Sequence, residues 1–449
     1  MSDTLLVIAA KAVKLAEKLG ASQAEAYVAQ SRSFAIDVEN SAIKSASEKR
    51  DAGLGIRSVV DKRIGFAYVT TIEEKDIPNV AEQSVSLAKA SIPDPDFVSF
   101  PEASKSYPRI KDMTDSEIAN LSSEDAASLV VRTVEATTEA LGEIQAAIEA
   151  QLSANSGRRA IANSLGVEGT FESTSSFLYS YPTIKTEDDQ TSSFEYQISR
   201  KLNEIDPEWI GVGAAKNTLA SLGGRTIDPG EMPVILSPLA VGTVLGNGFA
   251  GAVNAEEVQY GRSYISDAFG EEIASEELEI IDDSLLRAGL GSRPFDAEGY
   301  PSSTTEVLSK GILKNLLHNS YTANKDGVEN TGNASRPSYA GIPSIAPSNF
   351  VITPGSGTLD DLISEVRKGV LVRNTYDRPN MTTGDLSAMV AEGHYIENGE
   401  VCCPVRSTLV GINMRELLKR ILRIGDDTRV TTSVVSPSIV IESAKITSG

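Results

Sequence analysis

The sequence predicts a multidomain α+β protein, and three observations lead to that class. The chain has 449 residues, which is too long for one simple core and favours two or three domains. Apolar residues make up 41% of it and charged residues 23%, as in soluble globular proteins. Helical and strand-like patterns alternate up to about residue 228, and the remainder is mostly strand-like with tight turns.

The first 110 residues have the pattern of a helix, several strands, a second helix and a linker. An amphipathic helix ends at Gly20, and the second helix is expected at 79–90. Residues 61–63 have the composition of a hairpin turn. The stretch 92–110 is rich in proline and serine, which is typical of a linker. The expected strands are 24–29, 34–39, 53–60 and 65–71.

The middle of the chain combines two helices with a long strand-like stretch. A helix at 124–141 has Ser122 or Ser123 as its cap. Residues 143–198 are strand-like and rich in serine and threonine, and a helix at 208–222 ends at two glycines. Farther on, we expect a short strand at 233–236, a late helix at 414–422 and a final strand at 438–442. Hairpin turns are expected at Lys310-Gly311 and, with the Asn-Gly pair typical of a type I′ turn, at Asn398-Gly399.

Charge and composition exclude several classes of partner. The formal net charge is −21, so the surface should repel nucleic acid and anionic membranes. No apolar run reaches the roughly 18 residues of a membrane span, and residues 1–20 do not have the pattern of a signal peptide. The only cysteines are Cys402 and Cys403, which cannot form a disulfide framework. We therefore expect a protein of the reducing cytoplasm.

The residues alone reveal no recognisable active site. Of the two histidines, neither His318 nor His394 lies in a zinc-protease spacing, and structural roles are favoured for both. Cys402 and Cys403 are expected to lie in a strand, one thiol buried and one exposed, rather than to bind a metal with His394. Asp296 and Glu298 are only a weak signal for acid/base chemistry, because such pairs are common in turns. The acidic run 271–283 is expected to form a solvated face.

A glycine-rich stretch, 245–255, has an unusual composition for the helix that its apolar spacing predicts. Ser237 is expected to cap this helix and Pro238 to occupy its first position. Each interior glycine costs roughly 1 kcal/mol relative to alanine. The segment should therefore be irregular, or packed too closely to admit side chains. The glycines inside this expected helix, which starts at Pro238, are Gly242, Gly246, Gly248 and Gly251.

Seven segments, taken in order, resemble the TldD/PmbA family of metalloproteases and within it the PmbA-like (TldE-like) branch. The resemblance covers nearly all of the chain and rests on the order of the segments rather than on one motif. They are GASQAEAYVAQS, AGLGIRSVVDKRIGFAYVT, NSGRRAIANSLG, RPFDAEGYPSSTTEVLSKGILKNLLHNSYTA, NTGNASRPS, TTGDLSAMVAEGHYIENGEVCCPVRSTLVGIN and IGDDTRVTTSVVSPSIVIE.

The resemblance implies a degenerate metal site. In the active branch the corresponding helix carries H-E-x-x-x-H, whose histidines bind zinc and whose glutamate activates water. Those three positions fall on Gly246, Asn247 and Gly251, none of which can perform these roles. The active branch draws a further ligand from a cysteine near the C-terminal strand, and residues 428–442 contain none. We therefore expect no cofactor in this chain and zinc in a TldD-like partner.

The family also implies an architecture and a role. The expected units are an N-terminal α/β domain with linker (1–110), a middle α/β segment (111–227) and a β-rich, barrel-like C-terminal domain (228–449). The chain is expected to be the non-catalytic half of a dimer, paired with a TldD-like subunit or with itself. The pair would cleave peptides or unfolded segments inside an enclosed cavity.

Four consecutive residues are expected to lie near that cavity, because their segment matches the family closely and mixes polar with apolar side chains. They are His318, Asn319, Ser320 and Tyr321. Two other readings stay open. One is a homodimeric peptidase with an unusual site built from His318, His394, Asp296, Glu298 or Cys402. The other is a peptide-binding scaffold without proteolytic activity.

Overall fold

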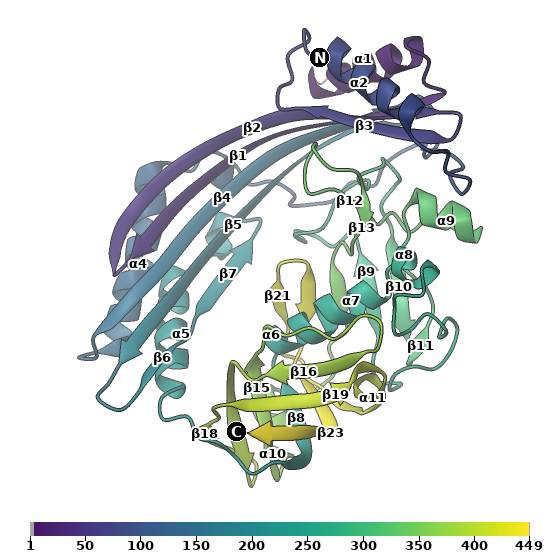
Figure 1. The fold of residues 1–449 in the computed structure, drawn as a ribbon. Coiled ribbons are helices and arrows are strands. Elements are labelled where there is room, and N and C mark those ends of the chain that lie inside the picture. Colours follow the sequence, from purple (N-terminus) through teal and green to yellow (C-terminus); the bar gives the residue numbers. More distant parts are fainter. Residues whose placement is uncertain (1–3, 449) are drawn as a thin grey trace.

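The computed structural model describes residues 4–448, in which a long curved sheet arches over a C-terminal part built from smaller sheets (Figure 1). The long sheet is antiparallel and has seven strands in the order β3-β2-β1-β4-β5-β6, with β7 also paired to β5. Its strands are β1 (Gln23–Glu39), β2 (Ala42–Val60), β3 (Arg63–Val69), β4 (Ala146–Asn163), β5 (Glu168–Lys185), β6 (Gln190–Ser192) and β7 (Glu195–Ser199).

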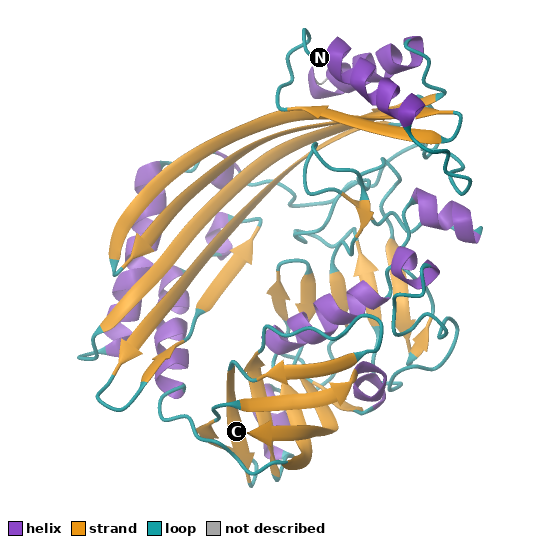
Figure 2. Cartoon of the chain, viewed as in Figure 1, coloured by secondary structure: helices purple, strands orange, loops and turns teal. Residues whose placement is uncertain are grey.

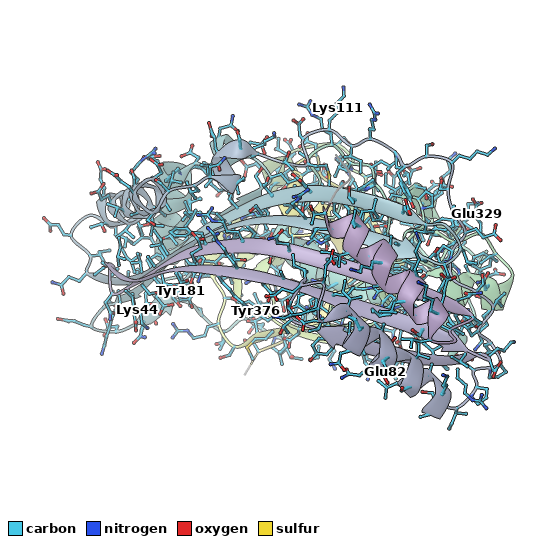
Figure 3. The ribbon with its side chains drawn as sticks, turned by 90° about the horizontal axis from the view of Figure 1, so that it is seen from above. Lys44, Glu82, Lys111, Tyr181, Glu329 and Tyr376 are labelled. Atoms are coloured by element: carbon cyan, nitrogen blue, oxygen red, sulfur yellow. The ribbon has the colours of Figure 1, made fainter. Side chains whose placement is uncertain are left out.

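Helices cover the outer, convex face of this sheet at its two ends (Figures 1 and 2). Helices α1 (Thr4–Lys18) and α2 (Ile77–Ala90) lie over one end, where they pack on Ala26 and Val28 of β1. At the other end α4 (Ser123–Leu141) and α5 (Pro207–Ala220) pack on Phe34 and Ile36 of the same strand. These four β1 residues have even numbers, so the odd-numbered residues face the concave side. The view from above shows α1 and α2 lying over the strands at their end of the sheet (Figure 3).

Several expectations for this half are confirmed. Strands β2 and β3 form the hairpin at Asp61 and Lys62, which have φ of 49° and 62°. Ser122 caps α4 by accepting a hydrogen bond from the amide of Asp125. The two strands expected at 24–29 and 34–39 are instead one continuous strand, β1. Because β1 pairs with β4, one sheet spans both sides of residue 110; the domain boundaries near 110 and 228 stay predictions.

The C-terminal part contains three sheets, and within residues 4–448 all three are open rather than closed into a barrel. The expected α+β class is confirmed. One has eight strands, ordered β16-β19-β23-β8-β15-β17-β18 with β20 beside β23. The second has six, ordered β11-β10-β9-β14-β22-β21, and β12 pairs with β13. The strands are β8 (Gly230–Leu236), β9 (Ile280–Asp283), β10 (Thr304–Ser309), β11 (Ile312–Leu313), β12 (Ala334–Ser335), β13 (Ser344–Ile345), β14 (Phe350–Ile352), β15 (Lys368–Asn374), β16 (Asp385–Met389), β17 (Glu392–Glu397), β18 (Glu400–Pro404), β19 (Thr408–Asn413), β20 (Ile421–Ile424), β21 (Arg429–Thr431), β22 (Val434–Ser436) and β23 (Ile439–Ser448).

A run of short helices lies between these sheets and shares their largest hydrophobic core (Figure 1). No helix within residues 4–448 combines the length and apolarity needed to cross a membrane. The remaining helices are α3 (Ser116–Ala119), η1 (Leu202–Glu204), α6 (Pro238–Val241), η2 (Gly242–Asn247), α7 (Gly248–Ala252), α8 (Ala255–Gln259), α9 (Ser320–Asp326), α10 (Leu359–Ser364) and α11 (Met414–Lys419).

Both C-terminal hairpins are confirmed. Asn398 and Gly399, with φ of 53° and 80°, join β17 to β18, and Lys310-Gly311 joins β10 to β11. The late helix ends earlier than expected, because Ile421 leaves the helix and pairs with Ile441 of β23.

Candidate functional site

The glycine-rich segment changes its hydrogen-bonding pattern midway. Pro238 lies in the first turn of α6 as expected, η2 is a π-helix, and α7 returns to α-helical bonding. Single π-turns are rare and frequently mark functional sites. Ser237 does not cap the helix, which corrects the prediction: its Oγ donates instead to the carbonyl of Arg373 at 2.7 Å.

The glycines of this segment are in close contact with their neighbours. A Cβ added at Gly246 would lie 2.6 Å from both γ-carbons of Val434 on β22. At Gly251 it would lie 3.0 Å from the terminal methyl of Met381. Asn247 is exposed. The segment is therefore both irregular and closely packed, the two outcomes that its composition left open.

The family positions do not fit a zinc ion. Protein zinc ligands are cysteine, histidine, aspartate and glutamate, whereas Gly246 and Gly251 have no side chain and Asn247 offers a neutral amide. Within residues 4–448, no three such ligand side chains lie close enough together to hold a metal ion. The side chain of Val434 occupies the space that a side chain on Gly246 would need.

Asp296 and Glu298 lie together in a fully buried turn that contacts the concave face of the long sheet. Asp296 accepts backbone amides from Glu298 (2.8 Å), Tyr300 (3.0 Å) and Ala334 (3.1 Å). Burial, with help from the Glu298 carboxylate, raises the pKa of Asp296 to about 7. The two carboxylates therefore do not lie in an ordinary exposed turn, but the oxygens of Asp296 already accept hydrogen bonds from the protein.

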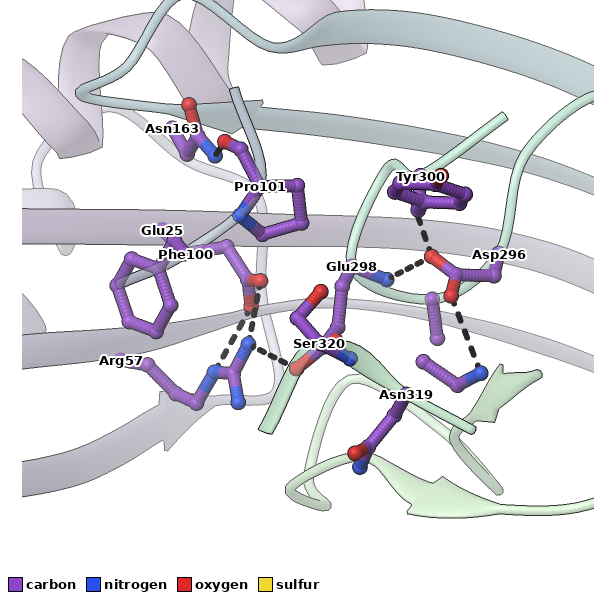
Figure 4. Close-up of polar contacts among 12 residues, drawn as sticks. Glu25, Arg57, Phe100, Pro101, Asn163, Asp296, Glu298, Tyr300, Asn319 and Ser320 are labelled. Carbon is purple, nitrogen blue, oxygen red and sulfur yellow. Dashed lines mark hydrogen bonds and ion pairs between the residues drawn. The ribbon is translucent and has the colours of Figure 1, made fainter. Parts of the chain in front are cut away.

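Glu298 joins the C-terminal part to the long sheet through buried ion pairs (Figure 4). Its carboxylate accepts from Arg57 of β2 at 2.9 Å and from the backbone of Ser320 at 2.9 Å. Arg57 also pairs with Glu25 of β1, which in turn pairs with Arg336. Burial opposes ionisation of Glu25, but Arg336 and Arg57 outweigh it and hold the pKa of Glu25 below its usual value. Removing one member would leave a buried charge unpaired.

His318 is buried, and it lines a cavity. Its Nδ1 lies 3.2 Å from the hydroxyl of Thr322, and burial lowers its pKa. The cavity has a volume of about 720 Å³ and is also lined by Asp326 and Glu329. Of the four residues expected near a cavity, His318 is thus the one that lines this space.

The three residues that follow have structural contacts. Asn319 is the N-cap of α9 and forms a capping box with Thr322. Ser320 accepts a hydrogen bond from Asn330 at 3.0 Å. The hydroxyl of Tyr321 donates to Asp94 at 3.3 Å, and its ring packs near Phe97 and Phe100. A role for these residues in substrate binding stays a prediction.

His394 and the two cysteines lie on the β17–β18 hairpin. His394 Nε2 is 3.0 Å from the carbonyl of Ala220. Cys402 is exposed and Cys403 half-buried, so the expectation of one buried thiol is wrong. The reason is a register shift opposite Tyr395 and Ile396, which interrupts strict alternation along β18.

An aromatic row on the concave face was not singled out from the sequence. It consists of Phe177, Tyr179 and Tyr181 of β5 with Tyr196 of β7, all half-buried. Phe177 lies 5.7 Å from Tyr179 and 5.4 Å from Tyr196 between ring centroids. The signal was present as an alternation of period two in residues 177–181. Beside the row, a cavity of about 660 Å³ is lined by Tyr196, Trp209 and Pro238.

Three family models match consecutive parts of the chain. They are the PmbA/TldA metallopeptidase domain 1 at residues 24–88, the central domain at 116–222 and the C-terminal domain at 229–448. A metalloprotease PmbA homolog from Haemophilus influenzae is 27% identical over 97% of this chain and 94% of its own. Metalloprotease PmbA from Escherichia coli O157:H7 is 25% identical over 94% and 92%.

A solved structure agrees with these matches. The crystal structure of TldE from Thermococcus kodakarensis superposes with a TM-score of 0.90 and 26% identity, covering 98% of this chain and 99% of that one. The sequence similarity and the shared fold extend over nearly the whole chain. This chain belongs to the PmbA/TldD metallopeptidase family and is PmbA/TldE-like within it.

Proposed function

We propose that this chain is the non-catalytic subunit of a two-chain metallopeptidase, paired with a TldD-like subunit that carries the zinc. The observation that carries the proposal is the helix η2–α7, where Gly246, Asn247 and Gly251 stand at the ligand and base positions of the active branch. A glycine supplies no ligand, and a neutral amide cannot accept a proton as a general base.

The concave face suits the holding of peptides for a partner's active site. Phe177, Tyr179 and Tyr181 expose part of their rings on one side of β5, while Leu178 between them is buried beneath the helices. Tyrosine rings cover apolar side chains and their hydroxyls bind backbone groups, largely regardless of peptide sequence. Peptides and unfolded segments are therefore the proposed substrates of the complex.

Co-expression with a TldD-like protein that contains H-E-x-x-x-H tests the proposal. The two chains should co-purify, the complex should hold zinc and cleave an unfolded polypeptide, and this chain alone should hold no stoichiometric zinc and cleave nothing. Cleavage by the isolated chain with about one zinc per chain would favour the homodimeric peptidase instead. Failure to associate, with peptide binding retained, would favour the scaffold.

A matched variant locates the peptide surface. Tyr179→Ala and Tyr181→Ala remove rings from the row on β5, whereas Tyr68→Ala removes a ring from the same concave face but on β3, at the far edge of the sheet, 6.5 Å from the ring of Tyr339. With assembly intact, we expect the first two variants to raise the KM of the complex for peptide and Tyr68→Ala to leave it unchanged. Equal KM values in all three would remove the aromatic row of β5 from the proposal.

A further inference from the structure

A small pocket lies where the segment 290–297 and β12 meet the concave face of the long sheet. Its volume is about 160 Å³. Four arginines line it, which we call the arginine pocket: Arg159, Arg200, Arg293 and Arg336. Asp296 is the only acidic residue in its wall. Whether the pocket is neutral or cationic therefore depends on which of these arginines pair with a carboxylate of the protein.

The charge of Arg336 is offset inside the protein. Its guanidinium pairs with Glu25, and its side chain is fully buried. Glu25 and Glu298 together face Arg57 and Arg336, so this buried cluster contains two positive and two negative groups. Arg336 closes one wall of the pocket but adds no uncompensated charge.

Arg200 has no such partner. Its guanidinium donates to backbone carbonyls, including those of Gly289 and Leu290 at 2.8 Å each. Within residues 4–448 no carboxylate lies within ion-pair distance of it. Burial, together with the positive charge of Arg159, lowers the pKa of Arg200 to about 10.

Arg293 and Arg159 have donors to spare. Nε of Arg293 is buried and has no acceptor among residues 4–448, which is costly for a cationic donor. Arg159 donates one hydrogen bond, from Nη1 to Ser173 at 3.0 Å, and lies over the ring of Phe171. Asp296 cannot serve both, because backbone amides already occupy its oxygens.

We propose that the arginine pocket binds a carboxylate group, held between Arg159 and Arg293. Guanidinium groups bind carboxylates through paired, charge-assisted hydrogen bonds. The pocket is small, with a volume of about 160 Å³, and admits a carboxylate with a few carbons. The Asp296 carboxylate in the wall disfavours a dianion such as phosphate. The site goes beyond the proposed function and does not depend on it.

Isothermal titration of the full chain with four probes tests the proposal. The probes are a tetra-alanine peptide with a free C-terminal carboxylate, the same peptide amidated, an amidated peptide with one central glutamate, and inorganic phosphate. Binding of the free-carboxylate peptide identifies a peptide terminus as the source, and binding of the glutamate peptide identifies a side chain. Failure of both carboxylate probes to bind, or tighter binding of phosphate than of either, overturns the proposal.

Two variants and a matched control locate the binding. Arg159→Gln and Arg293→Gln should each weaken carboxylate binding about tenfold or more. Arg158→Gln removes the same charge one residue away on β4, but Arg158 points to the opposite face and pairs with Glu172 at 2.7 Å. The control should bind as the native chain does. Either pocket variant, folded by circular dichroism and binding with native affinity, refutes the site; two variants are made so that one misfolded protein does not decide the matter.

Discussion

Replacing Gly246 with alanine should destabilise the protein, although alanine is the better helix former. In an open helix the change would gain roughly 1 kcal/mol. Here the new methyl would lie 2.6 Å from both γ-carbons of Val434, far inside normal contact distance. Val434 is stiff at χ1 and lies on β22, a strand held between β14 and β21, so it cannot move aside easily. Overpacking costs about 1–3 kcal/mol. Because two γ-carbons of a stiff side chain are met at once, we expect the upper part of that range, about 2–3 kcal/mol, and so a net loss of about 1–2 kcal/mol.

Gly251→Ala is the matched control in the same segment. Its methyl would meet only the flexible end of Met381, at 3.0 Å, so this variant should be as stable as the native chain or slightly more so. With equal denaturant slopes, Gly246→Ala should therefore lower the denaturant midpoint, whereas Gly251→Ala should leave it unchanged or raise it slightly. Combining Gly246→Ala with Val434→Ala should recover most of the overpacking cost, as a coupling energy of the two sites. An unshifted midpoint for Gly246→Ala, or strict additivity in the double variant, would refute the packing argument.

The same contact bears on restoring the family motif. The triple change Gly246→His, Asn247→Glu and Gly251→His should yield no peptidase, because an imidazole at 246 meets Val434 even more severely than a methyl does. The cysteine ligand of the active branch is also missing from residues 428–442. Zinc content and peptide cleavage by the purified variant are the measurements. Cleavage at a rate comparable to an active TldD-like enzyme would contradict the expectation.

Three further perturbations have expected outcomes. Gly399→Val should destabilise by roughly 1–3 kcal/mol, because Gly399 has φ of 80° and a Cβ would lie 2.8 Å from the carbonyl of Ser364; an unchanged melting temperature would argue against this. Burial raises the folded-state pKa of Asp296 to about 7, so the stability that protonated Asp296 contributes is complete below its unfolded pKa and is lost as pH rises through 7. The free energy of unfolding of Asp296→Asn, relative to that of the native chain, should therefore increase from pH 5 to pH 8. Parallel pH profiles of stability for the two proteins would contradict this. Asn319→Ala removes the cap shared with Thr322 and should cost about 1 kcal/mol, seen as faster amide exchange confined to α9.

The sequence predicted elements well where one face of the element is buried by a neighbour. Helix α4 follows its apolar spacing and its Ser122 cap. The hairpin at Asn398-Gly399 follows from the turn that those two residues favour. In both cases the information is local, because the cap or turn lies within a few residues of the element that it begins or joins.

Strand β1 shows why the rest was not predictable. Its two ends are apolar on the helix-covered face, but residues 30–33 between them are polar, and the strand was therefore expected as two. The helices α1 and α2 cover one end and α4 the other (Figure 1). No helix packs on the middle of the strand, so its sequence does not need to alternate apolar with polar residues. Hydrogen bonding to β2 and β4 carries the strand through that stretch.

The candidate site depended on contacts that no local pattern encodes. Glu298 meets Arg57 across 241 residues of sequence, and Arg336 meets Glu25 across 311. The acidic run was expected to be solvated, yet Asp282 within it is buried, and burial raises its pKa to about 6. A single sequence gives the residue types of such a cluster but not their pairing, since any of several basic residues could have met each carboxylate.

The packing around η2 is relevant to the proposal that the metal ligands of the active branch have been replaced in this chain. If only the ligands had been lost, a cavity would remain beside the helix, and voids of that kind destabilise a core. In this chain Val434 and Met381 occupy the space next to Gly246 and Gly251, and the helix shares the largest core of the C-terminal part. Gly246 and Gly251 thus contribute to the close packing of the C-terminal core. Under the proposed function, a subunit packed in this way would hold peptides on its concave face and leave cleavage to the partner, which is the division of labour that a two-chain peptidase requires.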